Sequence, residues 1–72
     1  MFPNLNAEQA RYAESNSDVA NILGITRVAY ESRKRTGKFS LADVNKLCDH
    51  YSCDYAYLFA EHPIAPDAKK AR

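Results

Sequence analysis

Gly24 is the feature that most constrains how this chain can fold, because it directly follows a short apolar pattern with helical spacing. Val19, Ala20 and Leu23 lie three and four residues apart, which predicts a helix with one apolar face. The residue just past a helix end often adopts a left-handed conformation, which glycine reaches without steric cost. We therefore expect this helix to end at Gly24 and the chain to turn sharply there.

The residues after this turn predict a second helix packed closely on the first. Ile25 is an apolar residue at the corner, and Thr26 is a good N-cap because its hydroxyl accepts a hydrogen bond from the free N–H groups of a helix start. Ala20 is small enough to let two helices cross closely, and Tyr30 supplies apolar contact on the second helix, expected over residues 26–35. A small residue, a glycine turn, an apolar residue and a capping hydroxyl in this order indicate a helix-turn-helix.

Three more helices are predicted, one before this pair and two after it. Residues 5–13 are expected to form the first, with Asn4 or Asn6 as its N-cap. Residues 55–60 are expected to form the last, with Asp54 as its N-cap. The predicted fold class is therefore all-α, a single compact bundle of about five short helices that contains the helix-turn-helix.

The helix between them is predicted by a capping box. Ser40 is a good N-cap, and Asp43 follows three residues later, where an acidic side chain favours the start of a helix. The apolar residues of this helix recur at helical spacing and are expected to face the core: Leu41, Val44, Leu47, Cys48 and Tyr51.

Length and composition limit the chain to one small domain. Its 72 residues leave room for a single modest core, expected in residues 1–60. Residues 61–72 contain two prolines and end in a polar run, which predicts a flexible C-terminal tail. No apolar run is long enough to span a bilayer, so we expect a cytoplasmic protein without membrane contact. Cys48 and Cys53 are the only cysteines, and we expect both to be reduced and buried.

No catalytic or cofactor-binding motif is recognisable. The two histidines, His50 and His62, are far apart, and the chain has neither a glycine-rich phosphate loop nor a nucleophile elbow. A metal site built from Cys48, His50 and Cys53 would lack a fourth ligand and a usual spacing. We expect no enzyme activity, no cofactor, no bound metal and no small-molecule substrate.

The strongest charge feature is the basic run over residues 33–38, Arg-Lys-Arg-Thr-Gly-Lys. Cations suit the C-terminal end of a helix, so these side chains need no ligand; the alternative is that they contact phosphate groups. The formal net charge is only +1, from ten Lys and Arg against nine Asp and Glu. A dedicated DNA-binding domain is usually more basic, because the release of counterions from phosphates drives much of its affinity.

From about residue 5 to residue 59 the chain resembles the λ-repressor-like helix-turn-helix family, the Cro and repressor proteins of phages. The resemblance rests on the segment 18–27 (DVANILGITR), on Tyr30, on Phe39-Ser-Leu and on the closing Tyr57-Leu-Phe. It implies a bundle of about five helices that binds operator DNA in a lysis/lysogeny switch.

The resemblance also implies which residues bind. Asn16 lies where the family commonly has glutamine, and would contact the DNA backbone. Arg27 would be the best base reader, through a bidentate hydrogen bond to guanine. Nine residues are predicted to form a DNA- or partner-binding surface: Asn16, Ser17, Thr26, Arg27, Val28, Glu31, Ser32, Arg35 and Lys38.

Two functions follow from the resemblance and the charge pattern. The first is a small transcription regulator that binds operator DNA, which the family favours. The second is an antirepressor. Phage switches also use small proteins of this fold that bind the repressor instead of DNA. Asp18 and Glu31 place carboxylates on the helices that would face phosphate, which favours a protein partner. The predicted partners are operator DNA, a phage repressor protein or both, with a homodimer as a further alternative.

Overall fold

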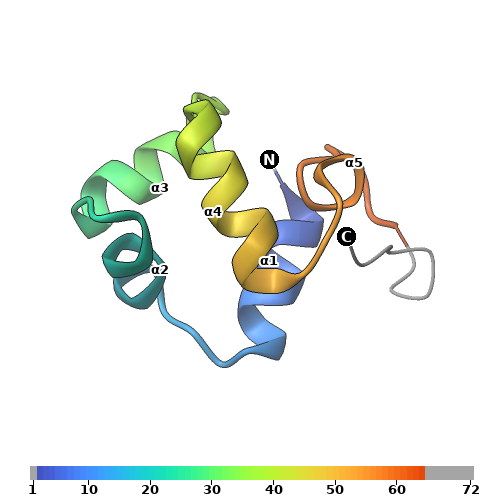
Figure 1. Cartoon of the computed structure of the whole chain (residues 1–72), viewed down its shortest axis with the longest axis horizontal. Helices are drawn as coiled ribbons and strands as arrows, with labels where there is room; N and C mark the ends of the chain where they lie inside the picture. The colour runs from blue at the N-terminus through green and yellow to red at the C-terminus, as the bar shows by residue number, and fades with distance from the viewer. Residues whose placement is uncertain (1, 65–72) are drawn as a thin grey trace.

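Five helices form the chain in the computed structural model, which describes residues 2–64. They are α1 (Pro3–Arg11), α2 (Asn16–Leu23), α3 (Arg27–Thr36), α4 (Leu41–Tyr51) and α5 (Tyr55–Leu58). Helix α4 crosses the middle of the molecule, with α2 and α3 on one side and α5 on the other (Figure 1). Residues 2–64 contain no strand. The all-α fold class with about five short helices is confirmed.

The corner between α2 and α3 has the local structure that the sequence predicts. Gly24 ends α2 in the left-handed conformation, with φ of 73°, and its N–H donates to carbonyl groups of the preceding turn. The N–H of Ile25 then donates to the Ala20 carbonyl oxygen at 3.0 Å, which satisfies another acceptor at the helix end. Thr26 is the N-cap of α3, and its hydroxyl accepts a hydrogen bond from the Ala29 N–H at 3.1 Å.

The start of α1 differs from the prediction. The helix begins at Pro3, two residues earlier than expected, and its N-cap Phe2 makes no side-chain cap. Asn4 was expected to be a cap but is buried, and its side-chain amide donates to the carbonyl oxygens of Tyr57 and His62, each at 2.9 Å. The prediction of an Asn4 cap is wrong because these distant carbonyl groups, which local sequence does not reveal, use the amide.

The predicted cap of α4 is confirmed, whereas the predicted cap of α5 has the expected position but no side-chain hydrogen bond. Ser40 and Asp43 form the predicted capping box at the start of α4. Asp54 is the N-cap residue of α5 but makes no side-chain cap, and α5 ends at Leu58, two residues before the predicted end. Ile64, the last described residue, packs against the core. The remainder of the predicted tail lies outside the described residues.

Most of the predicted core is buried, with Leu41 as the clear exception. Leu47, Cys48 and Tyr51 on α4 are buried as expected, and Val44 is partly buried against the same core. Leu41 is 75% exposed, so its prediction as a core residue is wrong. Leu41 is the first residue of α4. Helical spacing places it in line with the core-facing residues but does not show whether the core extends to the end of the helix. Both cysteines are buried, as predicted.

A buried carboxylate links α1 to α5. Glu8 pairs with Arg11 one turn further along α1, and its side chain is fully buried. The carboxylate accepts hydrogen bonds from the Tyr57 hydroxyl at 2.8 Å and from the Arg11 guanidinium. The bond to Glu8 is the main reason that the pKa of Arg11 lies above its ordinary value. A buried carboxylate is tolerated here because charged and hydroxyl donors satisfy it.

Candidate interaction surface at the α2–α3 corner

The nine residues predicted to bind DNA or a partner lie at the start of α2, along α3 and in the loop after α3. We call this set the corner surface. Three of its members are partly buried: Asn16, Glu31 and Ser32. The other six are exposed: Ser17, Thr26, Arg27, Val28, Arg35 and Lys38. The two helices that carry most of the corner surface lie side by side at the end of the molecule away from α5 (Figure 1).

The structure brings Asn16, Arg27 and Glu31 together in one network. The Arg27 Nη1 atom donates to both carboxylate oxygens of Glu31, at 2.9 and 2.8 Å. The Asn16 side-chain amide donates to Glu31 Oε2 at 3.0 Å from the neighbouring helix. These bonds, with the one from Asn16 contributing most, hold the pKa of Glu31 below its ordinary value. A charged carboxylate is therefore fixed in the middle of the corner surface.

A second network holds Asn16 from the inside, and the sequence pattern did not indicate it. The Asn16 Oδ1 atom accepts hydrogen bonds from Gln9 Nε2 at 3.0 Å and from Lys34 Nζ at 3.1 Å. The Gln9 Oε1 atom accepts from the buried Tyr30 hydroxyl at 2.8 Å. Lys34 also donates to Asn6 at 2.9 Å, and its Nζ lies 4.9 Å from the centre of the Tyr30 ring. Both ends of the Asn16 amide are therefore used within the protein.

The basic run over residues 33–38 divides into inward and outward cations. Arg33 Nη1 donates to Asp43 Oδ2 at 2.7 Å and so connects α3 to α4. Lys34 belongs to the inner network, and burial lowers its pKa. Arg35 and Lys38 are exposed, and neither makes a side-chain hydrogen bond or ion pair within the part of the chain that the structure describes. Only these two members of the run are available to an external anion.

The chemical character of the corner surface is mixed. Arg27, Glu31 and Arg35 supply charges of both signs, and Val28 adds an apolar side chain that is 64% exposed. Asp18 follows Ser17 on α2, where its carboxylate accepts a hydrogen bond from the Ser15 N–H at 2.9 Å as part of a capping box. A surface of this composition is suited to contacts with another macromolecule.

A further polar cluster lies on the other side of the α1–α2 loop. Glu14 Oε1 accepts from the Tyr51 hydroxyl at 2.7 Å, and Glu14 Oε2 lies 2.7 Å from His50 Nε2. The ring of Tyr12 packs edge-on against Tyr51, with 4.9 Å between the centroids. This cluster ties the loop to the end of α4.

Residues 2–64 contain no group of three or more His, Cys, Asp or Glu side chains arranged to hold a metal ion. Within the same residues, every helix is too short or too polar to cross a membrane. Comparisons with protein-family models, curated proteins and solved structures find no match to this chain.

Proposed function

We propose that this chain is a small transcription regulator of a phage-type genetic switch, in which α2 and α3 act as a helix-turn-helix that binds a protein. The proposed partner is the DNA-binding domain of a repressor, so that the chain acts as an antirepressor. The observation that carries this proposal is the fixed carboxylate of Glu31, held by Arg27 and Asn16 in the middle of the corner surface.

The charge of Glu31 favours a basic protein over DNA. The expected base reader, Arg27, directs its Nη1 atom to this carboxylate, and the expected phosphate contact, Asn16, has both ends of its amide bonded within the protein. A DNA-binding surface of a repressor is rich in Lys and Arg. A carboxylate that is already held in place can accept hydrogen bonds from such side chains, and it loses less conformational entropy on binding than a mobile carboxylate does.

The exposed apolar side chain of Val28 supports the same partner. Val28 lies three residues before Glu31 and four residues before Ser32, so the three side chains are neighbours on one face of α3. Protein interfaces combine an apolar contact that excludes water with polar groups around it. The corner surface offers this combination, since Val28 is 64% exposed and the polar residues Glu31 and Ser32 follow it by three and four positions on α3.

Operator DNA is the second candidate, and the exposed cations favour it. Arg35 and Lys38 lie at the end of α3 and in the loop that follows, exposed and available to phosphate groups. Val28 could contact a thymine methyl group in the major groove. For this function Arg27 would have to exchange the Glu31 carboxylate for a guanine edge.

Titration calorimetry with the DNA-binding domain of a phage repressor tests the proposal. The unmodified chain should bind the repressor, and Glu31→Lys should weaken binding at least tenfold because like charges then face each other. Glu61→Lys is the matched control, because Glu61 is exposed and lies outside the corner surface. It should bind as the unmodified chain does.

A gel-shift titration with the operator DNA of that repressor distinguishes the two candidates. An antirepressor should release the repressor from this DNA and should not shift the DNA by itself. A shift by the chain alone that weakens steeply with salt and is reduced in Arg35→Ala would establish DNA binding instead. Loss of repressor binding in Glu61→Lys as well as Glu31→Lys would remove the corner surface from the proposal.

A further inference from the structure

Lys34 on α3 lies where three helices meet, and its ammonium group donates to the other two. The Nζ atom donates to Asn6 Oδ1 on α1 at 2.9 Å and to Asn16 Oδ1 on α2 at 3.1 Å. It also donates to Gln9 Oε1 at 3.5 Å and lies over the ring of Tyr30. The side chain is partly buried, and these acceptors replace the water that its charge has lost.

The hydrogen bonds on the two sides of Asn16 have only one possible direction. An ammonium group can only donate, and an ionised carboxylate can only accept. Asn16 lies between two such groups, with Oδ1 toward Lys34 and with Nδ2 3.0 Å from Glu31 Oε2. Gln9 supports the same orientation, because its Nε2 atom donates to the Glu14 carbonyl oxygen at 3.1 Å and to Asn16 Oδ1 at 3.0 Å. The amide of Asn16 therefore has one favourable orientation, which depends on the donors behind it.

We propose that Lys34 is a positioning residue, which orients the Asn16 amide and so holds the Glu31 carboxylate ready for a basic partner. If the amide turned over, its oxygen would face the carboxylate and the two acceptors would repel each other. With Lys34 in place, an N–H group faces Glu31 instead. This role deepens the proposed function and rests on it only for the step from Glu31 to the partner. The step from Lys34 to Glu31 is a property of the free chain.

Lys34 can act on Glu31 through Asn16 or by the direct attraction of opposite charges. The hydrogen bond from Asn16 is the largest cause that holds the pKa of Glu31 below its ordinary value, ahead of the bond from Arg27. The direct attraction of Lys34 is the smallest cause. Most of the influence of Lys34 on Glu31 should therefore pass through the amide of Asn16.

NMR titration of the Glu31 carboxyl group in the free chain separates the two routes. Lys34→Met keeps the length of the side chain but cannot donate, so it should raise the pKa of Glu31 toward its ordinary value. In an Asn16→Ala background the same substitution should leave the pKa of Glu31 nearly unchanged, because the amide through which Lys34 acts is absent. An equal rise in both backgrounds, or no rise in Lys34→Met alone, would overturn the proposal.

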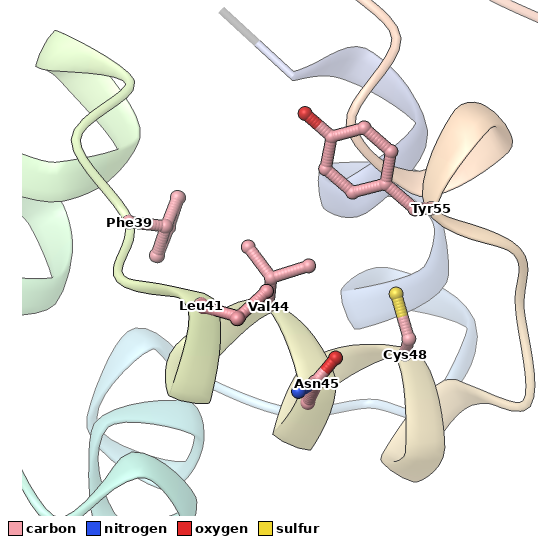
Figure 2. Close-up of a pocket in the computed structure, with 6 residues that line it drawn as sticks. All are labelled: Phe39, Leu41, Val44, Asn45, Cys48 and Tyr55. Atoms are coloured by element: carbon pink, nitrogen blue, oxygen red, sulfur yellow. The ribbon is translucent and has the colours of Figure 1, made fainter.

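Two control variants on α4 match these substitutions. Lys46→Met removes the same charge from an exposed position. Asn45→Ala removes the same amide from the hollow of about 480 Å³ between α4 and α5, which Phe39 and Tyr55 also line (Figure 2). Neither control should change the pKa of Glu31, and a rise in either one as large as in its matched variant would contradict the role of Lys34.

A second substitution keeps the test decisive if circular dichroism shows that Lys34→Met is unfolded. Lys34→Gln retains a polar group at the junction of the three helices. Because glutamine can accept as well as donate, it no longer fixes the orientation of Asn16. The pKa of Glu31 should rise in this variant too, and an unchanged value would overturn the proposal.

Calorimetry with the DNA-binding domain of a phage repressor measures the consequence for binding. Lys34→Met should weaken binding about tenfold through the less well held carboxylate, whereas Lys46→Met should bind as the unmodified chain does. Equal affinities of the two variants would overturn the role of Lys34 in binding. If the unmodified chain binds no repressor while the pKa of Glu31 responds as expected, the proposed function fails and the positioning of Glu31 by Lys34 stands.

Discussion

The left-handed conformation of Gly24 gives the sharpest test of how the α2–α3 corner is formed. Its φ is 73°, a region in which a side chain costs about 1–2 kcal/mol and a β-branched side chain costs more. A Cβ atom built on Gly24 would meet no atom within 4 Å beyond Gly24 itself and its two chain neighbours. The cost of a substitution is therefore conformational and contains no clash with the residues packed around the turn.

We expect the free energy of unfolding to fall by about 1 kcal/mol in Gly24→Ala and by about 2–3 kcal/mol in Gly24→Val. For a domain of this size each kcal/mol lowers the melting temperature by about 4–8 °C. Gly24→Asn should cost least, because asparagine tolerates this conformation. Thermal unfolding followed by circular dichroism measures all three. An unchanged melting temperature in Gly24→Val, or an Asn variant as unstable as the Val variant, would refute the conformational argument.

Three other predictions follow from the packing. Glu8→Ala should lower the free energy of unfolding by about 1–3 kcal/mol, because it leaves the Tyr57 hydroxyl without its acceptor; chemical denaturation measures this, and an unchanged midpoint would contradict it. Burial raises the pKa of Tyr30 and Tyr51 above the ordinary value of about 10. The unfolded chain ionises these phenols first, so stability should be complete below about pH 10 and fall above it, which alkaline unfolding curves test. Cys48→Ala should cost about 1 kcal/mol through a small cavity, and a more stable variant would count against the packing described for it.

The parts of the fold that were predicted correctly are those that depend on residues close together in the sequence. The turn at Gly24 and the capping box of Ser40 and Asp43 are formed by residues within a few positions of each other, so local chemistry decides them. Asn4 was expected to cap the first helix, and nothing in the sequence pattern marked Glu8 as buried, but each is bonded to a residue about fifty positions away. No local pattern distinguishes such a buried polar residue from an exposed one.

The corner surface likewise combines features that local sequence predicts with contacts that only the packing of the helices reveals. The sequence predicted which residues would lie along α3, because helical spacing determines them. The bonds of Asn16 come from Gln9, Glu31 and Lys34, on two other helices, and only the packing of those helices could reveal them. The exposure of Leu41 was missed for a related reason, since periodicity places a residue on a face but does not show where the neighbouring helices end.

The hydrogen bonds of Asn4 have a consequence for the kinetics of folding. This one amide joins positions 53, 58 and 60 residues apart, while most bonds of the molecule are local. Closing so long a loop is entropically unfavourable until the helices have formed, so these bonds belong to the last stage of folding. Their loss in Asn4→Ala would therefore act on the native state and not on the folding barrier. The unfolding rate would increase while the folding rate stayed nearly constant.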